Sequence, residues 1–149
     1  MRIFILVGVL VAAVIAGPGV MAAPPSDACA LLTAEQVGAA LGAKMGAGKY
    51  VSPGFTKTCT WNAPGVIVTL MLQNAKAFQA GKAAPVPSEV TPASGLGDDA
   101  YYLAVGNIVG LIVKKGTAAF KVTIYNSSLP METKQQIEKT LAQQVLTKL

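Results

Sequence analysis

Apolar residues recur at helical spacing near both ends of the region that follows residue 30. In LLTAEQVGAALG, Thr33 precedes the first helical positions and Gln36 follows it three residues later, which is the pattern of a capping box. Gly42 is a residue type that commonly ends a helix. The segment therefore predicts a helix over residues 34–41.

A second amphipathic helix is predicted after Pro130. Its apolar residues recur at every fourth position: Ile137, Leu141, Val145 and Leu149. We expect three charged residues on the opposite, solvent-facing side of this helix: Lys134, Glu138 and Lys148.

Between these helices, segments with strand-like alternation are separated by turn residues such as Pro64-Gly65 and Gly106-Asn107. The predicted strands cover residues 58–62, 66–73, 100–105, 108–114 and 117–126. In the first of them Cys59 and Trp61 alternate in phase, and we expect both side chains to point into the core.

The order of these elements predicts an α+β fold in one domain, residues 23–149. The fold is a single antiparallel sheet of about five strands, with the N-terminal and C-terminal helices packed on one face. Residues 75–80 predict a short helix. Residues 81–94 contain three prolines and predict a long surface loop, whereas residues 46–56 predict a loop or a poorly formed edge strand.

The last predicted strand has one apolar and one polar face. Three apolar residues alternate with three others that point the opposite way: Phe120, Val122 and Ile124 against Lys121, Thr123 and Tyr125. Together with Tyr101, the residues Lys121, Thr123 and Tyr125 form a candidate binding surface. The alternative is an ordinary solvated sheet face.

Residues 1–22 predict a signal peptide. Arg2 precedes an uninterrupted apolar run over residues 3–16, Pro18-Gly19 ends that run, and small residues precede the expected cleavage after Ala22. A cleaved chain is exported, to a periplasm or to the outside of the cell. The alternative is an uncleaved anchor, because the uncharged segment is nearly long enough to span a bilayer.

Export bears on the two cysteines, Cys29 and Cys59. An oxidising compartment favours a disulfide between them, which would close a loop of about thirty residues and contribute roughly 3–4 kcal/mol. The alternative is a pair of free thiols or one reactive cysteine.

Charge and composition exclude several function classes. The formal net charge is +5, but the lysines are dispersed and the only arginine is Arg2, so we expect no nucleic-acid partner. The chain has no histidine, which removes histidine-based triads and the commonest transition-metal ligand. We therefore expect no metal site, no cofactor and no catalytic residue. A hydrolase that uses carboxylates or a Ser-Lys pair is the enzymatic alternative.

The segment GLGDDAYY, residues 95–102, presents two adjacent carboxylates. Asp98 and Asp99 point to opposite faces if they enter a strand, and no further acids lie nearby for a calcium site. Gly95 and Gly97 permit unusual backbone angles, and an aspartate can accept a hydrogen bond from a turn amide. We interpret these four residues as a structural turn that starts a strand.

Three segments together resemble a known group of proteins: DACALLTAEQVGAALG, CTW and GLGDDAYY. They are similar to small exported proteins of unknown function typified by actinobacterial envelope lipoproteins, with a Cys-x-Leu-Leu-Thr helix start, a Cys-x-Trp strand and a Gly-x-Gly-Asp-Ala-Tyr turn. The resemblance implies a PsbP-like α+β sandwich, a disulfide between Cys29 and Cys59, and an extracytoplasmic, non-enzymatic role. The chain departs from the pattern because it lacks a lipobox cysteine.

The sequence thus predicts an exported, disulfide-stabilised binding or interaction module. Its partner is an unknown envelope protein or a small ligand, and membrane contact is expected only if the N-terminal segment stays attached. A membrane-anchored accessory protein and the hydrolase named above are the alternatives.

Overall fold

The computed structural model describes residues 24–85 and 87–149. The predicted signal peptide, residues 1–22, lies outside the described residues. Within the part that is described, no helix combines the length and apolar character that crossing a bilayer requires.

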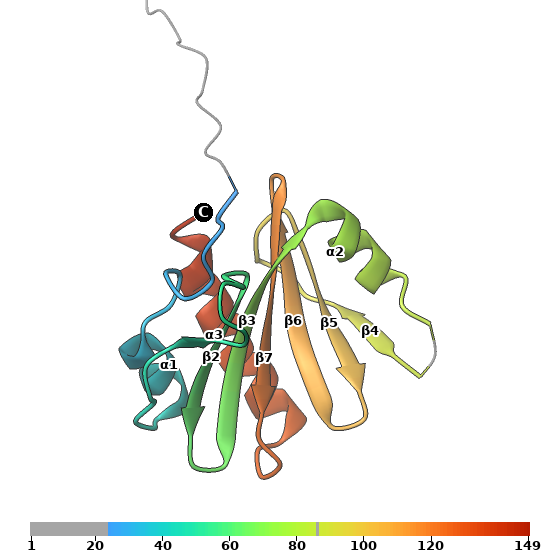
Figure 1. Cartoon of the computed structure of the whole chain (residues 1–149). Helices are drawn as coiled ribbons and strands as arrows, with labels where there is room; N and C mark the ends of the chain where they lie inside the picture. Colours follow the sequence, from blue (N-terminus) through green and yellow to red (C-terminus); the bar gives the residue numbers. More distant parts are fainter. Residues whose placement is uncertain (1–23, 86) are drawn as a thin grey trace, which may run out of the picture.

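The fold is α+β, with one antiparallel sheet, as predicted, but the sheet has seven strands in the order β1-β2-β3-β7-β6-β5-β4 (Figure 1). In chain order the strands are β1 (Lys49–Tyr50), β2 (Thr58–Ala63), β3 (Val66–Asn74), β4 (Glu89–Pro92), β5 (Asp99–Val105), β6 (Ile108–Lys115) and β7 (Ala118–Tyr125). β7, the last strand in the sequence, is therefore the central strand of the sheet.

The two additional strands lie at the edges of the sheet. β1 has only two residues and falls in the segment expected to be a loop or a poor edge strand. β4 falls in the predicted surface loop 81–94, and it pairs with β5 from Glu89↔Ala104 to Pro92↔Tyr101. An edge strand is hydrogen-bonded on one side only, so it tolerates a proline and needs little periodicity.

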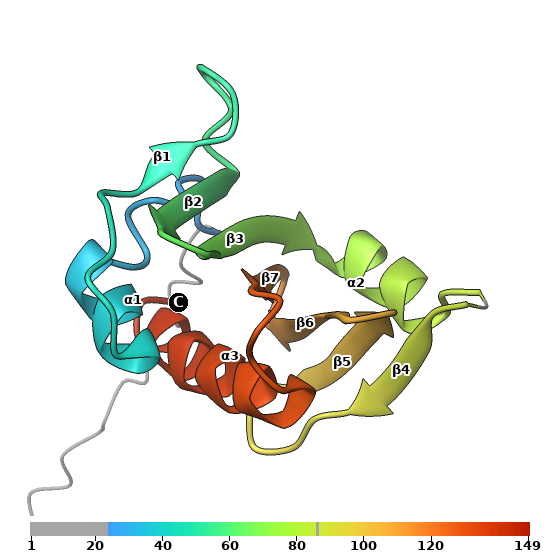
Figure 2. The same cartoon turned by 90° about the horizontal axis from the view of Figure 1, so that it is seen from below.

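Helices cover both faces of the sheet, not one (Figure 2). α1 (Ala34–Leu41) and α3 (Met131–Leu146) lie on one face, where α3 packs on β6 and β7 and its Leu141 and Val145 are part of the buried core. α2 (Ala75–Lys82) lies on the other face and forms a second, smaller core. There Phe78 meets Tyr101 edge to face, with ring centroids 5.0 Å apart.

The start of α1 confirms the capping box read from the sequence. The side chain of Thr33 accepts a hydrogen bond from the backbone N–H of Gln36 at 3.1 Å, and the Gln36 side chain accepts one from the N–H of Thr33 at 2.9 Å. Gly42 ends the helix in the left-handed conformation, with a φ angle of 65°. Local residue chemistry thus specifies where this helix begins and ends, and the buried side chain of Val37 joins it to the core.

A disulfide joins Cys29 to Cys59, with the two Cα atoms 5.0 Å apart. It links the segment before α1 to β2, next to the fully buried Trp61. Disulfides form and persist in oxidising compartments, so the bond indicates an extracytoplasmic location.

Candidate functional site

The predicted binding surface is mostly covered. Tyr101 and Thr123 were expected on a solvated face, yet their side chains are 1 % and 3 % exposed. α2 covers Tyr101, whose hydroxyl donates to the carbonyl oxygen of Phe78 at 2.9 Å. Lys121 and Thr123 fold over the bare backbone of Gly110 on the neighbouring strand. Only Tyr125 is openly exposed, so the expectation of one continuous solvated surface is wrong.

The two carboxylates of GLGDDAYY contact different parts of the chain. Oδ2 of Asp98 accepts a hydrogen bond from the backbone N–H of Gly116 at 2.6 Å, and so joins the turn before β5 to the β6–β7 turn. Asp99 forms an ion pair with Lys82 of α2, with 2.6 Å between Nζ and Oδ2. Gly95 and Gly97 both have positive φ angles. The geometry does not bring the two acids into one site.

A different site arises where β6 and β7 separate. Their pairing ends at Gly110↔Thr123. Beyond that point the end of β7 keeps its partners on β3, including Ile67↔Tyr125. The start of β6 keeps its partners on β5, including Val105↔Ile108. The central strand is thus paired on one side only at this end of the sheet.

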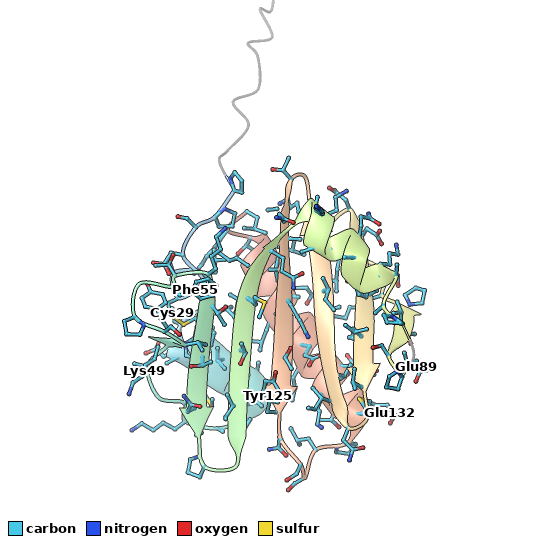
Figure 3. The ribbon with its side chains drawn as sticks, turned by 45° about the vertical axis from the view of Figure 1, so that its right-hand side comes forward. Cys29, Lys49, Phe55, Glu89, Tyr125 and Glu132 are labelled. Atoms are coloured by element: carbon cyan, nitrogen blue, oxygen red, sulfur yellow. A yellow bond between two sulfur atoms is a disulfide. The ribbon has the colours of Figure 1, made fainter. Side chains whose placement is uncertain are left out.

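A cavity of about 550 Å³ lies at this separation. Its walls come from the β2–β3 turn, the β5–β6 turn, the end of β7 and the start of α3, which converge at the lower end of the sheet in Figure 1. Much of the lining is aliphatic: Val66, Ile67, Ile108 and Ile124. Tyr125, labelled in Figure 3, contributes an aromatic ring at the same end. A volume of this size suits a small ligand.

Lys134 is the cationic side chain in the cavity wall. It is 4 % exposed, and its Nζ donates to the carbonyl oxygen of Asn107 at 2.9 Å. An ammonium group has three N–H donors. Two of these donors have no hydrogen-bond partner among the described residues.

Glu138 lies one helical turn further along α3 and is fully buried. Its Oε1 accepts a hydrogen bond from the backbone N–H of Ile124 at 3.2 Å, while Oε2 has no partner in the described structure. Burial raises the pKa of Glu138 to about 8, although the bond from Ile124 and the nearby charges of Lys121 and Lys134 oppose the shift. Burial and the charge of Glu138 also raise the pKa of Tyr102.

The prediction that Lys134 and Glu138 lie on the solvent side of α3 is wrong, because both are buried. Both residues belong to the buried stripe of the helix, with Leu141 and Val145. The spacing of these four positions, four, three and four residues, is that of one helix face, and it is visible in the sequence. Because Lys134 and Glu138 are charged, they were assigned to solvent, although their spacing from Leu141 and Val145 places them on the buried face.

At neutral pH Lys134 gives the cavity wall a cationic group, and burial favours the neutral form of the nearby Glu138. A carboxyl group with a pKa of about 8 is mainly protonated there, so Glu138 does not cancel the charge of Lys134. Within residues 24–85 and 87–149, no group of three or more His, Cys, Asp or Glu side chains is placed to hold a metal ion. The cavity can bind a ligand by hydrogen bonds and by attraction to the charge of Lys134, next to an aliphatic wall.

Ser127 lines the same cavity as Lys134, so these two residues are the candidates for the Ser-Lys pair of the alternative hydrolase hypothesis. A lysine that serves as a general base has to accept a proton from the serine hydroxyl. Here Nζ instead donates to a backbone carbonyl, and Ser127 is on the exposed rim. Among the described residues, no hydrogen bond joins Nζ of Lys134 to the hydroxyl of Ser127.

Comparisons with protein-family models, with curated proteins and with solved structures found no match to this chain.

Proposed function

We propose that the protein is an exported, disulfide-stabilised binding module that holds a small anionic ligand with an apolar body. The observation that carries the proposal is the buried ammonium group of Lys134 in the wall of an otherwise largely apolar cavity. Buried charges in proteins are normally paired. Lys134 has one backbone carbonyl partner, and the anionic end of a ligand would complete its coordination.

The aliphatic wall would take the apolar body of the ligand. Ile67, Ile108 and Tyr125 line the cavity and are also among the exposed large hydrophobic residues. A ligand that covers them would remove apolar surface from water, and that gain is roughly proportional to the area covered. An apolar pocket with a few convergent polar groups is the usual form of a small-molecule site.

Export, release from the membrane and membership of the envelope family that the three motifs resemble are parts of the same proposal. The disulfide between Cys29 and Cys59 supports the extracytoplasmic part. Mass spectrometry of the protein recovered from culture tests the cleaved form: a chain that starts at Ala23 is expected, and one that starts at Met1 would favour the anchored alternative.

Calorimetry with decanoate, decanol and decylamine tests the binding site. We expect decanoate to bind more tightly than the other two, because only its carboxylate can pair with Lys134. Lys134→Met keeps the apolar stem and removes the charge, so decanoate binding should weaken roughly tenfold or more while decanol is little affected. Lys76→Met, on an exposed position of α2, is the matched control.

Equal binding of decanoate to the wild type and to Lys134→Met would contradict the proposal, as would a preference for decylamine. A fluorophosphonate probe tests the hydrolase alternative in the same preparation. Labelling of Ser127 that Lys134→Met abolishes would establish a Ser-Lys enzyme in place of a binding module.

A further inference from the structure

β1 and the segment that joins it to β2 present apolar side chains to solvent, and none of these residues lines the cavity. We call residues 49–57, KYVSPGFTK, the tip loop. Val51 and Phe55 in this loop are 60 % and 49 % exposed, and Tyr50 is exposed as well. Large apolar side chains that gather in this way commonly mark an interaction site.

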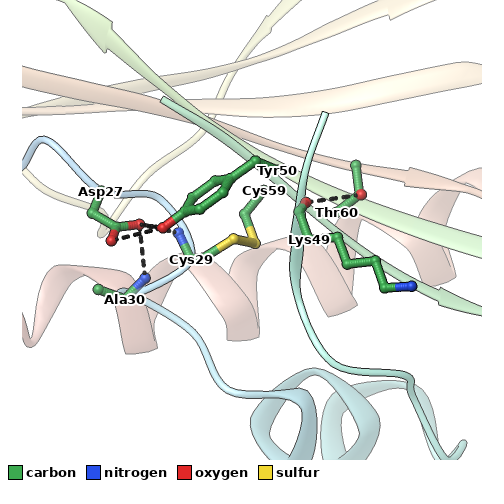
Figure 4. The surroundings of a disulfide bond; sticks show 7 residues. All are labelled: Asp27, Cys29, Ala30, Lys49, Tyr50, Cys59 and Thr60. Carbon is green, nitrogen blue, oxygen red and sulfur yellow. Dashed lines mark hydrogen bonds between the residues drawn. A yellow bond between two sulfur atoms is a disulfide. The ribbon is translucent and has the colours of Figure 1, made fainter. Parts of the chain in front are cut away.

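The base of the tip loop is held firmly in place (Figure 4). The hydroxyl of Tyr50 donates to both carboxylate oxygens of Asp27, at 3.0 and 2.9 Å, and the same carboxylate accepts from the N–H of Cys29 at 2.9 Å. The disulfide between Cys29 and Cys59 closes the loop base from the side of β2. These hydrogen bonds and the disulfide therefore fix the base of the loop that carries the apolar side chains.

A second pair of contacts fixes the returning strand of the loop. The carbonyl oxygen of Thr56 accepts from the N–H of Ala28 at 2.8 Å, and the hydroxyl of Thr56 donates to the carbonyl oxygen of Ser26 at 2.7 Å. Val51 and Phe55 lie between the two fixed ends, so their exposure does not come from fraying of the whole segment.

Two lysines flank the apolar tip, whereas the carboxylate of Asp27 lies at the base of the loop and is hydrogen-bonded to Tyr50. Lys49 and Lys57 are exposed at the two ends of the loop, and no acidic residue lies between them. Figure 3 shows Lys49 and Phe55 at the same edge of the molecule as Cys29. Lysine side chains, with apolar stems and cationic ends, and aromatic rings are suited to the boundary between lipid headgroups and acyl chains.

We propose that the tip loop docks the protein on an anionic lipid surface, with Val51 and Phe55 inserted between headgroups and with Lys49 and Lys57 paired to lipid phosphates. A specific protein partner normally needs about 800 Å² of surface on each side. A narrow loop with a few apolar side chains is small for that task, whereas it is sufficient for interfacial insertion supported by charge. This contact does not depend on residues 1–22 or on the cavity.

Vesicle binding with a fluorescent reporter in the loop tests the proposal. Phe55→Trp in the full chain is mixed with vesicles of phosphatidylglycerol and phosphatidylcholine, and with vesicles of phosphatidylcholine alone. We expect a blue shift of its emission and quenching by brominated lipid on the anionic vesicles only. Trp61 is buried and should contribute a constant signal. Because the reporter is in the loop, an N-terminal segment that binds lipid by itself would leave this emission unchanged, and that result would overturn the proposal.

Sedimentation with the same anionic vesicles measures affinity. Val51→Ser with Phe55→Ser should weaken binding roughly tenfold or more, and Lys49→Gln with Lys57→Gln roughly fivefold for each lysine. The matched controls are Val105→Ser, at the exposed last residue of β5, and Lys76→Gln with Lys139→Gln. Equal losses in the loop and control variants, or no vesicle binding by the wild type, would refute the proposal.

Discussion

The backbone N–H of Ile124 donates a hydrogen bond to Oε1 of Glu138 across 3.2 Å. A side chain of α3 thus provides the acceptor for a backbone N–H near the end of the central strand, β7. The same α3 places Lys134 against the carbonyl oxygen of Asn107 in the β5–β6 turn, at 2.9 Å. Two side chains of one helix thus bind the two sides of the separation between β6 and β7. This arrangement stabilises an opening that continued strand pairing would close.

Glu138 should make the protein less stable as pH rises. Its pKa in the folded protein is about 8, above the ordinary value of 4.5. Between these values the unfolded chain releases a proton that the folded chain retains, so the free energy of unfolding falls as pH increases and levels off above about 8. The loss is on the order of a few kcal/mol. Urea unfolding across this pH range measures it.

Glu138→Gln removes the titrating group while its amide oxygen can still accept from Ile124. We expect the pH dependence of unfolding to flatten markedly in this variant. Glu132→Gln, at an exposed position on the same helix, should keep the wild-type dependence. An unchanged profile in Glu138→Gln would show that the pKa of Glu138 is close to its ordinary value.

Binding of an anionic ligand should weaken as Glu138 ionises. Above about pH 8 its negative charge faces Lys134 and opposes an incoming carboxylate. Lys121 and Tyr102 also lie close enough to interact electrostatically with Glu138, so the transition will be shared among these groups. Calorimetry with decanoate should show this loss in the wild type and a smaller loss in Glu138→Gln. Equal losses in both proteins would assign the effect to another group.

Removal of the disulfide should lower stability substantially. Cys29→Ser with Cys59→Ser opens a loop closed across thirty positions of sequence. The chain-entropy relation gives a cost of roughly 3–4 kcal/mol. Guanidinium unfolding of the double variant, compared with the wild type in the presence and absence of reductant, measures the cost. Reduced wild type and double variant should agree, and an unaffected midpoint would exclude a structural role for the bond.

Asp98→Ala should cost more stability than Asp99→Ala. Asp98 accepts from the N–H of Gly116, and loss of such a bond costs about 1 kcal/mol or more when the amide is left without a partner. The side chains of Asp99 and Lys82 are partly exposed, and surface ion pairs contribute about 0–1 kcal/mol. Thermal unfolding of the two variants compares them. If Asp98→Ala keeps its stability but alters a binding activity, the turn interpretation is wrong.

Sequence patterns predicted the elements whose causes are local. Thr33 and Gln36 specify the start of α1, and alternation around Cys59 and Trp61 specifies β2 and its inward face. β4 was missed because an edge strand needs only a partner with free backbone groups, and its own residues carry little signal.

The candidate site was missed for a different reason. Charged side chains are usually exposed. Lys134 and Glu138 are buried instead, and each forms a hydrogen bond with a backbone group of the sheet or of its β5–β6 turn. The separation of β6 from β7 depends on pairing across the sheet, which no local pattern encodes. The covered face at Tyr101 and Thr123 likewise depends on the position of α2 and on the bare backbone of Gly110.

The central position of β7 affects how the molecule is assembled in a cell. The hairpin of β2 and β3 and the meander of β4, β5 and β6 are joined in the sheet only through β7, which begins at Ala118. During synthesis, the two halves cannot join into one sheet until β7 has been made. Until then each half has an unpaired strand edge, which is the kind of transient exposure that favours aggregation.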